Sequence, residues 1–524
     1  MSDPVRGNPG SWQQLALWEP DGSIDLGATR AQLPADDLNA ADFMRTMAWP
    51  EQLFYVPGDK QWYVWSGRHL QPDVSLKAAR CVDLIARWYE RLITEVRRQL
   101  TAELIAADPS LAASQDALRV KMSEAWKPWE AAAGYAKGLR GRGAAQLLAR
   151  LTARCGVAPE ELAERWPNLA NCASGVVNLT PAEGEPEWYR HDPRMRMTYL
   201  IEAAWSPDGA EAPLAKCPGF TRLMMRACGL GCEGWDQDAA GQVFWHLLKV
   251  LGYSVLGDNR LQLIYFLSGD TNSGKSKLLE CVSTVLGPEL AYPAKAALFE
   301  SDSPHSRHEV SLKRKRLVTL DESDEKLKMD ENQVKRLTGQ SQYTVGMLYD
   351  KTMTVIPVSW LIIIANNHMP TITHLDAALL RRLWVIPMGP TILPQDRDPV
   401  LVPKIIAAER DGIWALLVWA CREAMRDGGL GLLAPPAAIV GRTDEYRREQ
   451  DTIGRWMADC TWAANGSSPA VSGTDAHQSY FEWCGRTDIE GLSRNAFHGE
   501  MRSRPGVQRQ GDANHIWYKG FTLR

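Results

Sequence analysis

The sequence predicts an α/β protein with a sheet of parallel strands at its centre. Between Leu261 and Met388, short apolar runs alternate with segments of helical periodicity, which is the pattern of strands joined by crossover helices. Within this part of the chain, a glycine-containing loop follows one apolar run and opens a helix. These two observations predict a phosphate-binding α/β core, preceded by a mainly helical segment and followed by a small basic module.

The length and composition are those of a globular protein with several domains. The 524 residues allow roughly three domains, and 45% hydrophobic with 23% charged residues is close to the average. No apolar run approaches the ~18 residues of a membrane span, and the first residues lack a secretory signal. We therefore expect a cytoplasmic protein without a membrane partner. The net charge of −4 means that any contact with nucleic acid must come from local basic patches.

The chain before the core is expected to be mainly helical. Residues 1–40 show no sustained periodicity and are predicted to form a tail or flexible lead-in. In FYVPGDKQWYVW, aromatic and polar residues alternate around Pro57, which predicts a hairpin. From Ser75 to about Leu100, apolar residues recur at helical spacing. Helical patterns continue to Leu169, and the strand-like segment GVVNLT follows them.

The loop after the apolar run 261–267 fits the phosphate-binding pattern G-x-x-x-x-G-K-S. Its glycines let backbone N–H groups turn toward phosphate oxygens, and the helix that follows adds the positive end of its dipole. We predict that Lys275 reaches the β- and γ-phosphates of ATP and that the Ser276 hydroxyl binds Mg²⁺. The predicted nucleotide-binding residues are Gly269, Asp270, Thr271, Asn272, Ser273, Gly274, Lys275 and Ser276. The alternative is an ordinary loop, which the strand–loop–helix context disfavours.

A pair of acidic residues follows the next predicted strand, 317–320. Asp321 is placed to bind Mg²⁺, and Glu322 is placed to polarise the attacking water. Phosphoryl transfer requires mainly positioning and charge neutralisation, so one acid directed at the metal and one at the water suffice. The alternative is a solvated acidic loop, which we expect for Asp324 and Glu325.

The third apolar run, 361–365, ends in two asparagines, Asn366 and Asn367. An amide at the end of such a strand can contact the γ-phosphate and the attacking water of an ATPase. Asparagines at strand ends also form ordinary turns, and the residues alone do not decide between the two readings.

Two arginines, Arg381 and Arg382, follow shortly afterwards in DAALLRRLWVIPM. An arginine at this place can be supplied across a subunit boundary to the nucleotide of a neighbouring subunit. The alternative is a pair of surface arginines on a helix, which the residues alone would favour.

The segment between the acids and the asparagines predicts a β-hairpin with a charged tip. Two alternating runs, YTVGMLY and TMTVIPV, flank Asp350 and Lys351. Lys351 is the candidate for a DNA contact, and the alternative is an ordinary exposed lysine in a turn.

The last 70 residues or so predict a helix, a second helix and a hairpin, with Ser493 as the N-cap of the second helix. This order fits a winged helix, whose second helix and hairpin can lie on DNA. The candidate DNA-binding residues are Arg494, Arg502 and Lys519. The alternative is a basic face that contacts neighbouring subunits.

From about Leu53 to the C terminus, these segments resemble the superfamily 3 helicases of phages, satellite phages and large DNA viruses, the type found in poxvirus primase-helicases. The segments that carry the resemblance are, in order, FYVPGDKQWYVWSGRHL, ANCASGVVNLT with RHDPR, GDTNSGKS, LVTLDE, VKRLTGQSQYTVGMLYDKTMTVIP, IIIANNHMP and ALLRRLWVIP. One difference from the family is the absence of an arginine near Gly346, in the first hairpin strand.

The resemblance implies an α/β fold with a P-loop, AAA+-like ATPase core, a mainly α N-terminal domain and a C-terminal winged helix. It implies a DNA helicase that uses ATP and Mg²⁺, forms a homo-oligomeric ring, usually a hexamer, on single-stranded and forked DNA, and replicates a phage or mobile element in the cytoplasm of a bacterial host. The implied catalytic residues are Lys275, Glu322, the sensor Asn367, and Arg381 or Arg382 as the finger; Ser276 and Asp321 bind the metal, and Lys351 lies at the tip of a hairpin in the ring channel.

The expected domains are a tail at 1–40, a helicase-associated domain at 41–215, the ATPase domain at 216–395 with a helical collar at about 216–258, a helical lid or linker at 396–450, and the winged helix at 451–524. About 50 residues precede the first family-like segment, so we expect any primase to be a separate partner. The alternative functions are an origin-binding initiator that nucleotide only switches, or a packaging or defence NTPase. The predicted hairpin and Glu322 favour the helicase.

Overall fold

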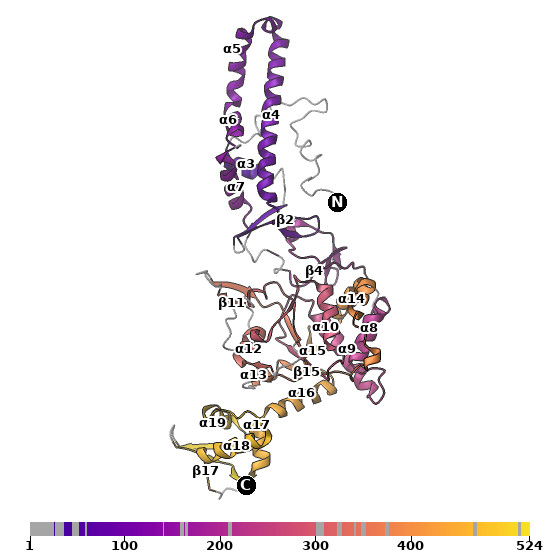
Figure 1. Ribbon diagram of the computed structural model, residues 1–524. Helices are drawn as coiled ribbons and strands as arrows, with labels where there is room; N and C mark the ends of the chain where they lie inside the picture. Colours follow the sequence, from indigo (N-terminus) through magenta and orange to yellow (C-terminus); the bar gives the residue numbers. More distant parts are fainter. Residues whose placement is uncertain are drawn as a thin grey trace. The chain divides into compact units, whose positions relative to one another are not determined.

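The computed structural model describes Leu26 and residues 36–44, 52–57, 60–139, 141–157, 162, 166–207, 212–299, 309–321, 327–339, 342–346, 353–372, 377–464, 469–511 and 515–524. The chain forms two compact units (Figure 1). The first consists of Met1–Glu211 with Val285–Leu290, and the second of Ala212–Thr284 with Ala291–Arg524.

The first unit contains a small antiparallel sheet, a bundle of helices and a second antiparallel sheet (Figure 1). The hairpin predicted around Pro57 is confirmed, because β1 pairs with β2 in antiparallel register. The long helix predicted after Ser75 is also confirmed, and it buries Val82 and Ile85 against the other helices. The elements are α3 (Asp37–Phe43), β1 (Leu53–Val56), β2 (Gln61–Trp65), β3 (Leu70–Pro72), α4 (Lys77–Ala107), α5 (Gln115–Trp126), α6 (Glu130–Gly138), α7 (Arg142–Arg154), β4 (Leu169–Cys172), β5 (Gly175–Asn178) and β6 (Trp188–Tyr189).

The centre of the second unit is a five-stranded sheet in which all neighbouring strands are parallel. Its order is β15-β7-β13-β9-β8. The strands are β7 (Ile264–Ser268), β8 (Ala291–Pro293), β9 (Leu317–Leu320), β13 (Leu361–Asn366) and β15 (Leu383–Pro387). Every residue of β9 and β13 is buried, as expected for parallel strands covered on both faces. The predicted α/β fold with a parallel sheet is therefore confirmed.

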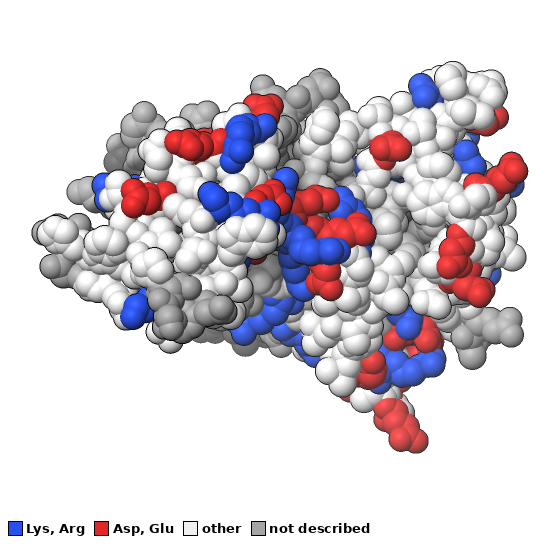
Figure 2. All heavy atoms as spheres, turned by 90° about the horizontal axis from the view of Figure 1, so that it is seen from below, with Lys and Arg blue, Asp and Glu red and all other residues white. Residues whose placement is uncertain are grey.

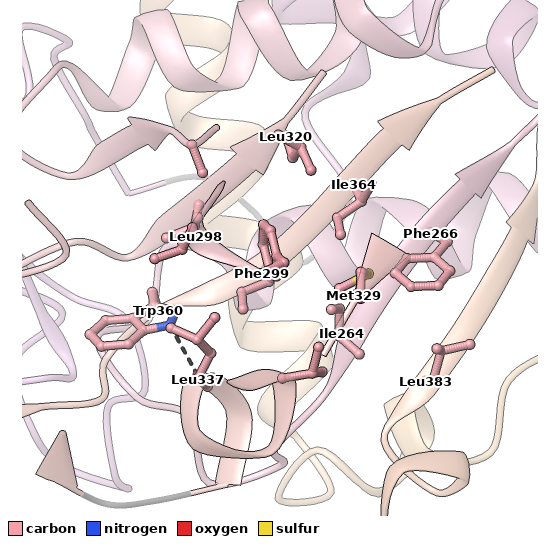
Figure 3. Close-up of a cluster of buried hydrophobic side chains, with 14 of the residues drawn as sticks. Ile264, Phe266, Leu298, Phe299, Leu320, Met329, Leu337, Trp360, Ile364 and Leu383 are labelled. Atoms are coloured by element: carbon pink, nitrogen blue, oxygen red, sulfur yellow. Dashed lines mark hydrogen bonds between the residues drawn. The ribbon is translucent and has the colours of Figure 1, made fainter. Parts of the chain in front are cut away.

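Helices cover both faces of this sheet. On one face, Phe266 and Ile364 of the strands pack in a cluster with Leu337 of α12 and Tyr446 of α16 (Figure 3). Trp360 closes the end of this cluster and donates its indole N–H to the carbonyl oxygen of Leu337 at 3.1 Å (Figure 3). On the other face, α9 lies against Tyr265 and packs along α14. The helices are α8 (Pro218–Ala227), α9 (Gln237–Tyr253), α10 (Lys275–Leu286), α12 (Glu331–Gly339), α13 (Ala377–Leu380), α14 (Leu401–Met425), α15 (Leu430–Leu433) and α16 (Ala437–Gln450).

The predicted hairpin before the asparagine strand is present. The strands β11 (Gln342–Gly346) and β12 (Met353–Pro357) pair in antiparallel register. A second small pair joins β10 (Lys328–Met329) to β14 (Thr371–Ile372) in parallel.

The last part of the chain has the predicted order of helix, helix and hairpin. Trp456, Tyr480, Phe497 and Phe521 form its core, and the Ser493 hydroxyl accepts the N–H of Ala496 as the predicted N-cap. The elements are α17 (Thr452–Cys460), β16 (Thr461–Ala463), β17 (Val471–Ser472), α18 (Gly473–Thr487), α19 (Arg494–Ser503), β18 (Gln508–Gly511), β19 (Ile516–Lys519) and β20 (Phe521–Leu523). Over the described residues of the whole chain, no helix combines the length and the apolar character needed to span a bilayer.

Candidate nucleotide-binding site

The loop with the pattern G-x-x-x-x-G-K-S joins β7 to α10 at the carboxyl edge of the parallel sheet. Gly269 has no room for a side chain, because a Cβ there would lie 2.8 Å from the Cβ of Met388. Gly274 has a φ of +94°, which only glycine adopts without strain. The segment after β15 forms a hydrogen bond to the loop, since the N–H of Ile392 donates to the carbonyl oxygen of Asn272 at 2.9 Å. The sequence context predicted for a phosphate loop is thus present.

Lys275 turns its amino group back onto this loop. The Nζ atom donates to the carbonyl oxygens of Gly269 at 2.6 Å and Asp270 at 2.7 Å, and to the Ser273 hydroxyl at 3.1 Å. Lys275 is only 4% exposed. Burial lowers the pKa of Lys275, and the carboxylates of Asp270 and Asp321 oppose this shift. All three N–H bonds of the ammonium group are therefore used to keep the loop in shape.

Ser276 and Asp321 meet beside this lysine. The Ser276 hydroxyl, on the first turn of α10, donates to Asp321 Oδ1 at 2.9 Å. Asp321 directly follows β9, which lies two strands away from β7 in the sheet. A hydroxyl and a carboxylate oxygen at this separation are the hard oxygen ligands that Mg²⁺ prefers. Glu322, the predicted partner of the attacking water, lies outside the described residues.

The two asparagines after the third strand differ in their surroundings. Asn366 is the last residue of β13, is 4% exposed, and lies beside Ser268 in the register of the sheet. Its Oδ1 accepts the N–H of His368 at 3.3 Å, whereas its buried Nδ2 has no hydrogen-bond partner. Asn367, the predicted sensor, is half-buried just after the strand. The buried amide without an acceptor at this edge therefore belongs to Asn366.

One side chain near the loop has no signal in the sequence. Arg442 of α16 donates from Nε to the Ser268 hydroxyl at 3.2 Å. Its Nη1 also lies 3.4 Å from a carboxylate oxygen of Glu445 and 3.3 Å from one of Glu449. Arg442 is 174 positions from Ser268 in the chain, so only the packing of α16 on the sheet brings the two together.

Arg381 and Arg382 lie at the opposite edge of the sheet. They directly precede β15, and the N–H of Ile264, the first residue of β7, donates to the Arg382 carbonyl oxygen at 2.9 Å. Arg382 is held within its own chain, because its Nη1 donates to the carbonyl oxygen of Lys335 at 3.4 Å and to the Thr338 hydroxyl at 3.3 Å. Arg381 is exposed. The structure thus distinguishes the two arginines, which the sequence left equivalent.

The candidate DNA contacts are described in part. Lys351 lies outside the described residues, between the two strands of the β11–β12 hairpin. Arg494, Arg502 and Lys519 are all exposed, and Arg494 donates to the Thr474 hydroxyl at 2.9 Å. The face drawn in Figure 2 carries Asp and Glu interspersed with Lys and Arg, so it presents no large field of one sign.

Comparison with known proteins links the chain to viral helicases. Residues 41–229 match the model of the family described as D5 N terminal like. A protein of Acanthamoeba polyphaga mimivirus named "Putative helicase L207/L206" is 26% identical over 259 residues, which are 45% of this chain and 26% of that protein. The chain therefore spans about a quarter of the length of this relative.

Two solved structures of the C-terminal region of NrS-1 also resemble the chain. One has a TM-score of 0.32 and 14% identity, and covers 61% of this chain and 79% of its own. The other has a TM-score of 0.31 and 12% identity, over 62% and 86% of the two chains. The sequence matches show a segment of the D5 N terminal like type and a partial similarity to a putative viral helicase.

Proposed function

We propose that the chain is an ATP-dependent DNA helicase of superfamily 3 type, with an AAA+-like P-loop core, which assembles as a ring on single-stranded DNA. The observation that carries this proposal is the convergence of Lys275, Ser276 and Asp321 at the carboxyl edge of one parallel sheet. Lys275 and Ser276 are the first residues of α10, and Asp321 directly follows β9, so the fold and not a local turn brings them together. The similarity to a mimivirus helicase supports the DNA-linked role.

The residues present fit ATP with Mg²⁺. Ser276 and Asp321 would hold the metal, which neutralises charge on the phosphates when it is bound. Lys275 would exchange its contacts with the Gly269 and Asp270 carbonyls for phosphate oxygens, and the backbone N–H groups of the loop would surround the phosphates. Glu322 follows Asp321 directly and is proposed to orient the attacking water. The amide of Asn366 or Asn367 would contact the γ-phosphate from the neighbouring strand end.

Arg381 is the proposed arginine finger, and it would act on the nucleotide of a neighbouring copy. A strand of five residues spans about 17 Å, and Arg381 lies before the start of β15 while the phosphate loop lies beyond the end of β7. The side chain therefore cannot reach the loop of its own subunit. A head-to-tail arrangement of copies would bring the two edges together, and such contacts close into rings.

The DNA contacts are proposed at two places. Lys351, which lies between β11 and β12 in the sequence, would contact the DNA backbone in the channel of a hexameric ring. The C-terminal module would act as a winged helix that uses Arg494 and Arg502 of α19 and Lys519 of β19. The ring would work on forked DNA in the cytoplasm of a bacterial host.

The proposal is tested with the Glu322→Gln protein and a labelled forked duplex. We expect the variant to bind single-stranded DNA and ATP like the unchanged protein but to lose both hydrolysis and strand displacement, because the water is no longer polarised. Lys351→Ala should weaken the stimulation of hydrolysis by DNA and reduce the salt dependence of DNA binding. Hydrolysis by the unchanged protein without strand displacement would point to another DNA-linked ATPase role. Full activity from a lone subunit would contradict the ring.

A further inference from the structure

A pocket of about 420 Å³ opens at the amino edge of the parallel sheet, beside the proposed finger. It lies at the edge where β7 and β15 begin, opposite the phosphate loop. The residues that line it are Leu261, Gln262, Arg381, Arg382, Trp384, Leu433 and Arg447. Three of these are arginines and none is acidic, so the pocket is strongly positive.

Among the lining residues, Trp384 and Arg447 each hold an N–H group that lacks an acceptor. The indole Nε1 of Trp384 and the Nε of Arg447 are buried and have no hydrogen-bond partner. The rest of the Arg447 guanidinium is fixed, because one nitrogen donates to the carbonyl oxygen of Leu380 and Nη1 donates to Asp444 Oδ1 at 3.1 Å. Its Cζ lies 5.7 Å from the centroid of the Trp384 ring. Buried N–H groups are nearly always paired in folded proteins, so two of them in one positive pocket indicate a missing acceptor.

The chemistry of the pocket selects an anion rich in oxygen. Guanidinium groups bind phosphate and carboxylate oxygens in a planar, directed manner. Leu261, Leu433 and the Trp384 ring supply the apolar part of the lining. Arg381 lies on the same pocket, so a group that meets the finger also meets Arg447 and Trp384.

We propose that this pocket receives the β- and γ-phosphates of ATP bound to the phosphate loop of a neighbouring copy, with Arg447 and Trp384 as contacts in addition to Arg381. This inference rests on the proposed ring ATPase. Both donors are buried in a single subunit, so the Arg447 guanidinium would have to turn away from Leu380 and Asp444 before it and the Trp384 indole could donate to phosphate oxygens. The ATP of the same subunit cannot be the ligand, because it would lie at the other edge of the sheet.

The test compares Arg447→Gln, Arg447→Lys and Trp384→Phe with the control Arg448→Gln. Arg448 is the next residue on α16, is exposed, and donates only to a backbone carbonyl in its own helix among the hydrogen bonds described. We expect Arg447→Gln to lower kcat about tenfold and Trp384→Phe about threefold, with the affinity of the subunit for ATP unchanged, since removal of one donor to a phosphate costs less than removal of the finger. Arg447→Lys should restore only part of the activity, because lysine lacks the planar fork. Arg448→Gln should match the unchanged protein.

Mixing separates a contact in trans from a structural role. Arg447→Gln subunits keep an intact loop, and Lys275→Ala subunits keep an intact pocket, so mixed rings should hydrolyse ATP faster than the mean of the two separate proteins. No gain on mixing, with normal melting temperatures, would overturn the role of Arg447. If Arg447→Gln fails to fold, the same mixing with Trp384→Phe decides the question. Mixing Arg381→Ala with Lys275→Ala subunits tests the proposed function itself. Faster hydrolysis in these mixed rings, but not in those with Arg447→Gln, would reject only the role of the pocket. No increase in hydrolysis in either mixture would reject the nucleotide site shared between copies.

Discussion

The two edges of the central sheet satisfy their polar groups in different ways. At the carboxyl edge, the ammonium group of Lys275 has three acceptors within its own loop, and the Ser276 hydroxyl donates to Asp321. At the amino edge, N–H groups of Trp384 and Arg447 are buried without an acceptor. The charged side chains at the first edge are paired within one chain, although the Asn366 amide there also lacks an acceptor, whereas the second edge is the one proposed to receive atoms from a neighbouring copy. This difference is what a site shared between copies requires of a single subunit.

The largest effect is expected at the carboxyl edge. Lys275→Ala should abolish ATP hydrolysis, with a loss of about a thousandfold or more, because the phosphates lose their main positive partner. Lys277→Ala is a matched control, since Lys277 is two residues further along α10 and its side chain pairs with Glu280 on the surface at 2.9 Å. Steady-state release of phosphate measures both. Turnover retained by Lys275→Ala would refute the assignment of the loop.

The second effect separates the two arginines of the amino edge. Arg381→Ala should lower turnover by about a thousandfold with ATP binding preserved, as expected for an arginine finger. Arg382→Ala should instead lower the free energy of unfolding by roughly 1–3 kcal/mol, because the side chain holds the end of α12 through Lys335 and Thr338. Turnover and melting temperature are measured for both variants. The opposite pattern would make Arg382 the finger.

The sequence predicted three strands of the central sheet, the loop between β7 and α10 and the order of the C-terminal helices, because each is encoded by local periodicity and turn residues. It could not separate Arg381 from Arg382, since adjacent residues share the same pattern and only the packing of α12 anchors one of them. The sequence also indicated no role for Arg442 or Trp384. Their roles depend on where α16 and β15 lie against β7, which no local signal specifies.

The third effect concerns the strand end at the carboxyl edge. Asn366→Ala should reduce turnover about tenfold, because the buried Nδ2 of Asn366 is the amide group that lacks an acceptor there. Asn367→Ala should have the smaller effect if Asn366 is the sensor. The rate of single-turnover ATP hydrolysis, measured for both variants, identifies the sensor asparagine. A larger loss of rate in Asn367→Ala would assign that role to Asn367, the residue that the family resemblance indicated.

The smallest effect is expected on stability at acid pH. It concerns α9, the helix that packs on the face of the sheet opposite α12 and α16. His246 is buried on α9, and burial lowers its pKa from 6.5 to about 4. The unfolded chain therefore binds a proton at higher pH than the folded chain, so this histidine costs no stability above pH 6.5 and progressively more as the pH falls toward 4. At pH 5 the cost is about 2 kcal/mol.

His246→Leu should remove this sensitivity without changing ATP hydrolysis at neutral pH. The measurement is the difference in melting temperature between pH 7 and pH 5, with a substitution of the exposed His515 as the control. An unchanged acid sensitivity in His246→Leu would show that another group is responsible. A changed rate of ATP hydrolysis in His246→Leu at neutral pH would show that the packing of α9 on the sheet affects the proposed nucleotide site.

The hydrogen bonds of Lys275 to its own loop bear on which anions the loop would bind. A free phosphate ion entering the loop would have to replace three short hydrogen bonds with contacts to a single small anion. A nucleotide brings several phosphoryl groups at once and can repay that exchange. In the proposed ATPase, this exchange would favour the binding of a nucleotide over that of the inorganic phosphate that hydrolysis would release.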